Sequence, residues 1–196
     1  MAAGKPSRGP DGRSGGQNRP RQEWHDPRQR VAADRMLQHE ISDALESLAD
    51  TLPDLVDYRL GRALLAVIEP SWTEHTSFQD EALFPILLRR HAGSDKLSVH
   101  VERFRREHVE IGSRHEEVIE QIELLITERI ANTDAFGYLL RNVFDSRRRH
   151  MEAETAVLDP LLPNLLAPAD RLALSEWSAA RPKPPFPISL LLGIRD

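Results

Sequence analysis

The sequence predicts an all-α protein: an up-down-up-down four-helix bundle with a short fifth C-terminal helix. Apolar residues recur at three- and four-residue spacing along most of the 196-residue chain, which is the period of amphipathic helices. Aromatic residues make up only 6% of the chain and β-branched residues are sparse, so few segments favour strands. Short segments of turn-forming residues separate the helical stretches. Four long amphipathic helices joined by short loops pack most economically as such a bundle.

The first half of the chain predicts two helices. The first covers about residues 34–49, and Pro53-Asp54 marks the turn that follows it. Its buried stripe is expected to consist of Met36, Ile41, Leu45 and Leu48. The second covers about residues 55–91, and we expect it to be interrupted or kinked near Pro70, which has no amide proton for the helical hydrogen-bond ladder.

The second half predicts three more helices. The third covers about residues 96–131, with Ser94 or Asp95 as its N-cap. The fourth covers about 132–158, and its first residue, an asparagine, is the N-cap. The short fifth helix covers about 168–180 and opens with a proline, which is favoured at the first helical position.

The chain divides into three parts. Residues 1–24 form a basic tail, rich in Gly and Pro, with too little apolar surface to offset the entropy of ordering, so we expect it to be disordered. Residues 25–180 form the bundle. Residues 181–196 are a Pro-rich extension with a leucine patch, expected to pack on the core or to contact a protein partner.

Composition excludes several classes of function. The chain has no cysteine, which excludes disulfides, thiolate metal sites and a cysteine nucleophile, so any metal must bind to histidine, carboxylate or amide groups. Its net charge is −5, and the basic residues of the tail leave the remainder more acidic, which argues against nucleic-acid binding. It contains no run of 18 apolar residues and no secretory signal, so we expect a cytoplasmic protein that does not enter a membrane.

A repeat on the second and fourth predicted helices carries the candidate chemistry. The segment from His75 to Pro85 aligns with the segment from His150 to Pro160. Each has a histidine, a polar acceptor four residues later, a leucine at the ninth position and a proline at the eleventh. The acceptors are Gln79 and Glu154, and the helix before each segment carries an inward candidate, His39 or His108.

Helical geometry explains why this spacing suits a metal. Residues four apart differ by about 40° in rotation and stack on one helix face. A histidine and a carboxylate so placed can both point into the centre of a bundle, as di-metal carboxylate bundles require. Imidazole with carboxylate suits iron, manganese or zinc.

This arrangement resembles the hemerythrin-like, or HHE cation-binding, domain family. The stretches that carry the resemblance lie within about residues 30–165 and surround His39, His75, His108 and His150, with Glu154 four residues after the last histidine. The resemblance implies a four-helix bundle in which these five residues are metal ligands, with a non-haem di-iron centre as cofactor.

The chain departs from the family pattern at Gln79, where the family has a glutamate ligand. A neutral amide is a poor iron ligand and supplies no bridging charge. Asp80 and Glu81 are rotated away from His75 on an α-helix, whereas Asp43 shares a helix face with His39. Three outcomes remain open: a weakened di-iron site, a site for a single iron, manganese or zinc ion, and a bundle without metal.

Two classes of function follow. The first is a non-haem iron protein that binds or senses a small diatomic or redox ligand such as O2, NO or peroxide. The second is a metal-free bundle that serves as a protein-interaction or regulatory module. A third class, metal-assisted hydrolysis or oxygenation of an organic substrate, ranks behind these two because no acid–base pair or substrate-cleft signature identifies catalytic residues. Enzymatic activity is therefore left undecided, with the balance against it. Around the site, His115 is a candidate for contact with a metal-ligating side chain or for lining the end of the bundle. Trp72 is expected in the core or as a lid, and Arg147-Arg148-Arg149 is expected on a solvated face.

Overall fold

A computed structural model describes residues 27–54, 56–127, 129, 132–162 and 167–181. These residues form helices and connecting turns and contain no strand, so the all-α prediction is confirmed for this part of the chain. The predicted tail and all but the first residue of the predicted extension lie outside it. No described helix is both long enough and apolar enough to span a membrane.

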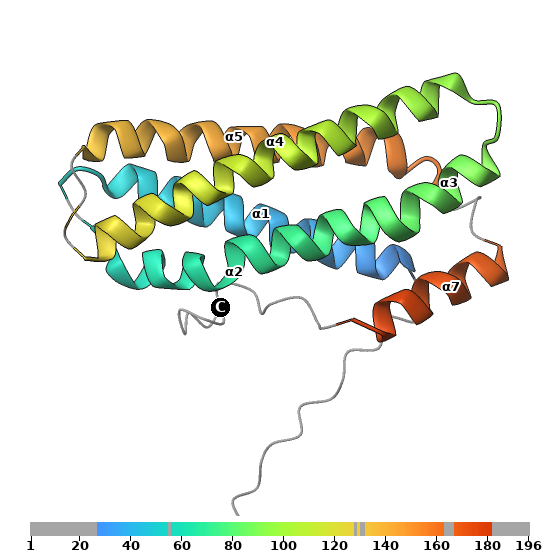
Figure 1. The fold of residues 1–196 in the computed structure, drawn as a ribbon, viewed down its shortest axis with the longest axis horizontal. Coiled ribbons are helices and arrows are strands. Elements are labelled where there is room, and N and C mark those ends of the chain that lie inside the picture. The colour runs from blue at the N-terminus through green and yellow to red at the C-terminus, as the bar shows by residue number, and fades with distance from the viewer. Residues whose placement is uncertain (1–26, 55, 128, 130–131, 163–166, 182–196) are drawn as a thin grey trace, which may run out of the picture.

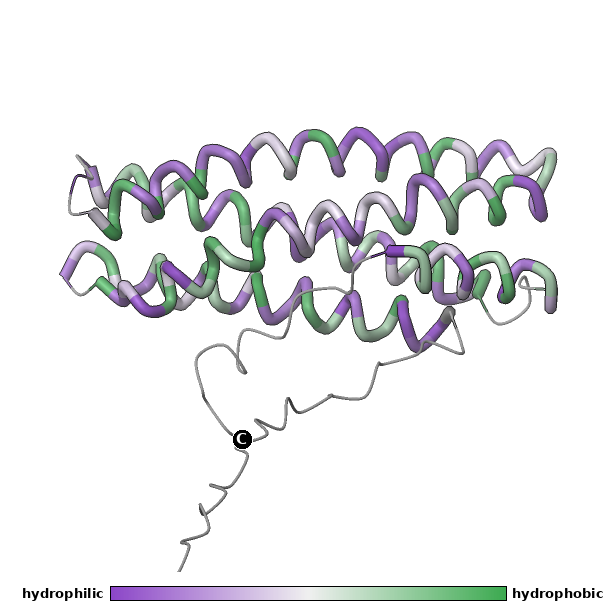
Figure 2. Tube along the Cα trace, turned by 60° about the horizontal axis from the view of Figure 1, so that its bottom comes forward, coloured by the Kyte–Doolittle hydropathy of each residue, from purple (hydrophilic) through white to green (hydrophobic). Residues whose placement is uncertain are grey.

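Four long helices lie side by side (Figure 1). They are α1 (Pro27–Thr51), α2 (Tyr58–Ser77), α4 (Asp95–Ile126) and α5 (Thr133–Leu158). Helices α1 and α4 each contact both α2 and α5. Apolar and polar residues alternate along these helices (Figure 2), as expected of amphipathic elements.

Helix α1 begins earlier than predicted, and three of the four residues predicted for its buried stripe, Ile41, Leu45 and Leu48, are fully buried as expected. It starts at Pro27, and Arg30 and Val31 in its first turns are buried. The guanidinium of Arg30 lies 4.3 Å above the ring of Phe78, so this part of α1 is held by packing that no local pattern reveals. Met36, predicted to be buried, is 65% exposed, because the inward stripe passes through Leu37 instead.

Pro70 does not interrupt α2, which runs through it to Ser77. Its ring is exposed, so water can satisfy the carbonyl that loses its amide partner. The departure from α geometry comes later, in a π-helix, η1 (Phe78–Leu83), which leads directly into α3 (Phe84–Arg90). The predicted interruption near Pro70 was therefore wrong, and the irregularity of this stretch lies at Phe78–Leu83 instead.

The predicted caps of the second half are confirmed. The Ser94 hydroxyl accepts a hydrogen bond from the amide of Leu97 at 3.4 Å, and Asn132 Oδ1 accepts one from the amide of Ala135 at 2.9 Å. Helix α4 ends at Ile126, before the predicted boundary.

A short helix, α7 (Pro168–Ala179), lies against one end of the four long helices (Figure 1). Its buried Asp170 pairs with Arg89 at 2.9 Å and with Arg90 at 2.6 Å, which ties α7 to α3. The apolar core forms two large clusters along the length of the helices. One includes Leu45, Leu64, Ile122 and Leu140. The other, at the α7 end, includes Leu83, Leu87, Phe104 and Leu158.

Candidate metal centre

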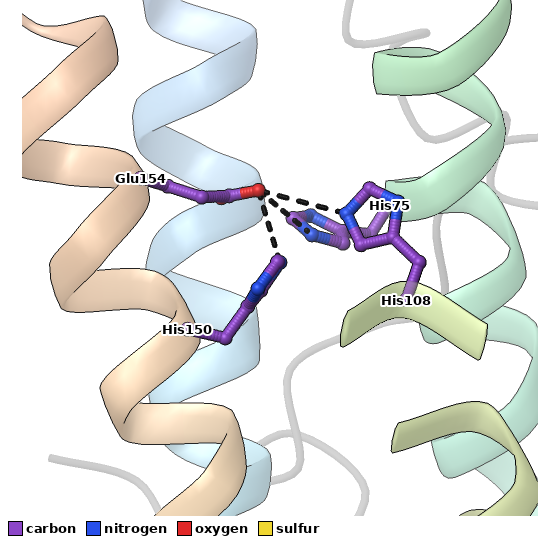
Figure 3. Close-up of side chains that lie close together, drawn as sticks. All are labelled: His75, His108, His150 and Glu154. Carbon is purple, nitrogen blue, oxygen red and sulfur yellow. Dashed lines mark ion pairs between the residues drawn. The ribbon is translucent and has the colours of Figure 1, made fainter. Parts of the chain in front are cut away.

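Three histidines and one glutamate from three helices converge in the interior (Figure 3). His75 lies in the last turn of α2, His108 in α4, and His150 and Glu154 one turn apart in α5. All four side chains are buried, with at most 4% of each residue exposed. Each offers one ligand atom, and these four atoms lie within 4.8 Å of one another. We call these residues the His3Glu group.

The distances from Glu154 Oε1 to the three imidazoles are near those between donors that share one metal ion. The distance from Glu154 Oε1 is 3.6 Å to His75 Nε2, 3.7 Å to His108 Nε2 and 3.0 Å to His150 Nε2. Nitrogen and oxygen donors placed about 2.0–2.2 Å from one tetrahedral ion lie about 3.3–3.6 Å from one another. All four of these atoms are buried, and none has a hydrogen-bond partner within the described residues. Orphaned buried polar atoms are costly, so a cation at their centre would satisfy them together.

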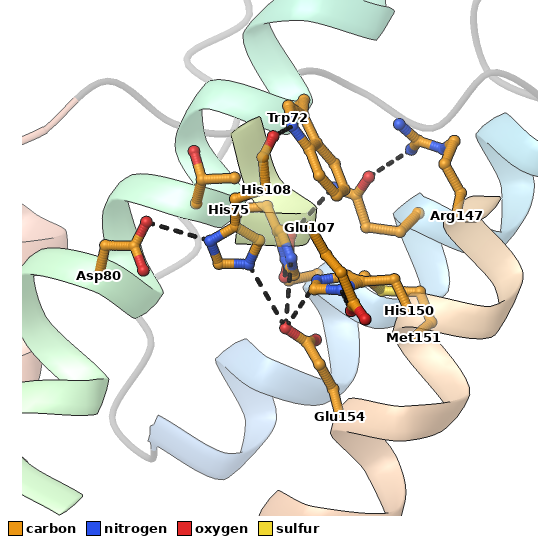
Figure 4. Close-up of polar contacts among 12 residues, drawn as sticks. Trp72, His75, Asp80, Glu107, His108, Arg147, His150, Met151 and Glu154 are labelled. Atoms are coloured by element: carbon orange, nitrogen blue, oxygen red, sulfur yellow. Dashed lines mark hydrogen bonds and ion pairs between the residues drawn. The ribbon is translucent and has the colours of Figure 1, made fainter. Parts of the chain in front are cut away.

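A carboxylate holds the other nitrogen of each imidazole, and Figure 4 labels two of the three, Asp80 and Glu107. The distances from Nδ1 are 2.6 Å from His75 to Asp34, 3.0 Å from His108 to Asp80 and 2.7 Å from His150 to Glu107. An Nδ1–H donated to a carboxylate fixes the ring orientation and leaves Nε2 as the free ligand atom. The carboxylate–histidine pair is the arrangement that supports histidine ligands in metal sites.

The same contacts shift the protonation of the His3Glu group. Burial opposes the charge on His75, but Asp34 and Glu154 outweigh burial and raise the pKa of this imidazole to about 10. Burial likewise opposes the charge on His150, and Glu107 and Glu154 raise its pKa. Burial disfavours the Glu154 carboxylate, yet the neighbouring histidines hold its pKa well below the usual range. Without a metal, protons on His75 and His150 therefore supply positive charge that faces Glu154.

Aromatic rings enclose the group. The indole of Trp72 stacks on His75 with ring centroids 5.0 Å apart, and its Nε1 donates a hydrogen bond to the backbone carbonyl of His108 at 3.1 Å. Phe84 stacks on the ring of His108 at 6.1 Å, and Phe104 lies edge-on to His150 at 5.6 Å. These walls exclude bulk water from the site and strengthen electrostatic interactions within it. The prediction that Trp72 is a core contact is confirmed.

A buried guanidinium contacts the same indole. Arg147 is 0% exposed and its Cζ lies 5.1 Å from the Trp72 ring centroid, so its assignment to a solvated face was wrong. It donates hydrogen bonds to Gln38 Oε1 and, at 2.8 Å, to His115 Nε2. Burial, together with the positive charge of Arg147, holds the pKa of His115 well below its usual value, which keeps this imidazole neutral and able to accept. His115 is therefore buried near the group and bonded to an arginine.

The structure does not bring His39 to the His3Glu group. Its side chain is exposed, and the neighbouring Gln38, rotated by about 100°, takes the inward position. Asp43, the alternative candidate on the same helix, is also on the outside, where its carboxylate pairs with Arg148 at 2.7 Å. The predicted apolar stripe of Ile41, Leu45 and Leu48 does face inward, and Gln38 lies on this buried face of α1 while His39 lies outside it.

Gln79 is buried at 3% exposure, and its Oε1 has no hydrogen-bond partner in the described part of the chain. It lies in η1, where the turn is wider than in an α-helix. A wider turn brings a residue five positions on closer to the same face. Asp80, five residues after His75, therefore reaches His108, although an α-helix would have turned it away. The expectation that Asp80 faces away was wrong for this reason.

Sequence reasoning missed the three carboxylates that hold the imidazoles. Asp34, Asp80 and Glu107 are three of 31 acidic residues, and each acts on a histidine of a different element. No spacing along the chain singles them out, because the contacts run between helices. Only knowledge of the π-helix η1 would have drawn attention to Asp80, and no sequence pattern predicts that π-helix.

No protein-family model, curated protein or solved structure matches this chain. The case for the site therefore rests on the residues themselves. The structure brings His75, His108, His150 and Glu154 together, as predicted, and leaves His39 outside. The chain thus carries a buried group of three histidines and one glutamate that could hold a metal ion.

Proposed function

We propose that this chain is a hemerythrin-like up-down-up-down bundle that holds one non-haem iron ion and binds or senses a small diatomic or redox ligand such as O2, NO or peroxide. The observation that carries the proposal is the convergence of four orphaned donors, the Nε2 atoms of His75, His108 and His150 and Oε1 of Glu154. Each imidazole is already oriented by a carboxylate on its other nitrogen.

The donor set favours iron or zinc. Imidazole suits both metals, and one carboxylate adds the hard oxygen donor that iron accepts. Four protein donors leave coordination positions open on an iron ion, which is where the metal would supply ligand binding or one-electron chemistry. The protein's own contribution is to orient the three imidazoles and to keep bulk water out.

One ion fits better than two. The His3Glu group supplies four donors, and a second ion would need further ligands. His39 is exposed, and Gln79 offers only a neutral amide. The cation of Arg147 on the adjoining Trp72 ring also disfavours a second metal charge. The single-metal outcome is therefore the one we propose, in place of the di-iron centre implied by the family resemblance.

A small ligand fits better than an organic substrate at the metal itself. The four group residues are almost completely buried, and Trp72, Phe84 and Phe104 pack directly on the imidazoles. Such close packing around the imidazoles favours a ligand of a few atoms over a larger one.

The second candidate is a metal-free bundle in which the group is a structural ion cluster. The observation in its favour is that His75 and His150 each contact two carboxylates, one at Nδ1 and Glu154 at Nε2. Protonated imidazoles would then be paired without any metal. The two candidates differ in whether the metal-free chain takes up iron when iron is supplied.

The test is metal content after anaerobic reconstitution with Fe(II), measured by elemental analysis on wild type, His108→Gln and His39→Gln. We expect about one iron per chain in wild type and in His39→Gln, and a clear loss in His108→Gln, which removes a donor. Fewer than about 0.2 ions per chain in the wild type would contradict metal binding and favour the ion cluster.

The ligand-binding part has its own readout. Addition of NO to the iron-loaded wild type is expected to produce new visible absorption and an electron paramagnetic resonance signal. An iron-loaded protein whose spectra do not change with NO would contradict a diatomic-ligand role while leaving iron binding in place.

A further inference from the structure

A cleft of about 450 Å³ lies between α4 and α5, beside the His3Glu group. Its walls come from one face of each helix, with residues such as Arg103, Glu107 and Arg114 on α4, and Ser146 and Arg149 on α5. This volume is within the range of small-molecule sites, about 300–1,000 Å³. His150 also lines the cleft, so it reaches the edge of the proposed metal centre.

Two guanidinium groups in the cleft converge on one neutral hydroxyl. Arg114 Nη1 donates to Ser146 Oγ at 3.0 Å, and Arg149 Nη2 donates to the same atom at 3.3 Å. Neither arginine has a carboxylate partner within the described residues. Two cations that approach one another without a counter-charge repel, and an anion placed between them would relieve this repulsion.

The other arginine of the cleft is already neutralised. Arg103 Nε lies 3.2 Å from Glu107 Oε1, and the second oxygen of Glu107 holds His150. Arg148, the neighbour of Arg149 on the outer side of α5, pairs with Asp43 and Glu46. Arg114 and Arg149 therefore stand out as cations available to a ligand.

The remaining lining restricts the class of anion. Glu107 and Glu110 line the same cleft, so a multiply charged anion such as a polyphosphate would meet two negative side chains. Ile111 and Ala153 add apolar surface. A ligand with one negative charge and an apolar body matches all of these groups.

We propose that the cleft between α4 and α5 binds a small organic monocarboxylate, whose carboxylate is held by Arg114 and Arg149 while its apolar part lies against Ile111 and Ala153. Guanidinium groups recognise carboxylates through paired, charge-assisted hydrogen bonds. The site does not depend on the proposed metal, because none of these four residues belongs to the His3Glu group.

The test uses the full chain, stripped of metal with a chelating resin so that the probe cannot bind to a metal ion. Benzoate is titrated at constant ionic strength while backbone amide resonances are followed by NMR. We expect saturable shifts around Ser146, with a dissociation constant of about 1 mM or tighter. The variant Arg114→Gln/Arg149→Gln is expected to bind at least about tenfold more weakly, because it loses both charge-assisted contacts.

The matched control is Arg141→Gln, an exposed arginine of α5 that pairs with Asp50 outside the cleft. It is expected to bind benzoate as the wild type does. If the double variant does not fold, Arg149→Gln alone serves, since this side chain is exposed and its loss disturbs no core.

Three results would overturn the proposal. They are the absence of saturable shifts, equal binding of neutral benzyl alcohol, and inorganic phosphate binding more tightly than benzoate. An equal loss of affinity in Arg141→Gln and in the double variant would overturn the assignment of the two arginines.

Discussion

The protonation of the His3Glu group makes the stability of the metal-free chain depend on pH in a definite direction. The pKa of His75 is raised from 6.5 to about 10 in the folded chain. A raised folded-state pKa stabilises the protein fully below the unfolded value, and this stabilisation is lost as the pH rises through the folded value. Between about pH 6 and about pH 8.5, His75 alone then accounts for a loss of about 2–3 kcal/mol in the free energy of unfolding. His150, whose pKa is also raised, acts in the same direction, whereas His115, whose pKa is lowered, offsets part of the loss at about pH 6.

The assay is urea unfolding of the metal-free chain, followed by far-ultraviolet circular dichroism across this pH range. The wild type and His39→Gln, whose exposed side chain lies outside the group, should lose the same amount. His75→Gln should lose about 2–3 kcal/mol less over the same interval, because it has no imidazole to deprotonate at this position. A wild-type stability that stays constant or increases from about pH 6 to about pH 8.5 would refute the reasoning.

Metal binding should counteract the loss of unfolding free energy at higher pH. A metal ion must displace the protons from the Nε2 atoms, so its affinity increases with pH. The stabilisation that iron adds over the metal-free chain is therefore expected to be larger at about pH 8.5 than at about pH 6. Parallel curves for the loaded and metal-free protein would show that the metal does not bind at these nitrogens.

Three further predictions concern single side chains. Glu154→Gln should lower the unfolding free energy of the metal-free chain, measured by urea unfolding, by about 2–4 kcal/mol, because the buried imidazolium groups lose their shared counter-charge. The same change at exposed Glu152 should cost less than about 0.5 kcal/mol. Equal effects of the two substitutions would contradict the cluster. Gln79→Glu should strengthen iron binding at least about tenfold in a chelator competition by adding a charged donor, and unchanged affinity would place this side chain outside the metal's reach. Arg147→Met should lower the unfolding free energy, measured by urea unfolding, by about 1–3 kcal/mol, since it leaves Gln38 Oε1 and His115 Nε2 without their donor. Arg149→Met should have little effect. Similar costs for the two variants would argue against the buried network.

Most of the helices could be predicted because their signals are local. Apolar periodicity, the caps at Ser94 and Asn132 and the proline at position 168 act within one or two turns, and the structure confirms them. The repeat of histidine and acceptor on two helices placed His75 and His150 correctly for the same reason. A pair separated by four residues shares a face of an α-helix wherever that helix is packed.

The failures concern the rotation and the distortion of helices. His39 and Gln38 are neighbours, and only packing decides which of them points inward. The π turn of η1 moved Asp80 onto His108, and no residue type in that segment specifies a π turn. Arg147 was predicted to be one of three solvated arginines, but the structure shows its guanidinium packed on the ring of Trp72.

The sequence by itself determined the all-α class, the order of the helices and the presence of histidines and a glutamate suited to a metal, since these depend on composition and on spacing within one helix. Only the tertiary structure decided that four of the predicted ligands meet and that His39 does not. It alone supplied the carboxylates behind each imidazole and the guanidinium beside Trp72. The physical reason is that these contacts join residues 28 to 109 positions apart, where the rotation of one helix against another, rather than any local pattern, decides which side chains touch.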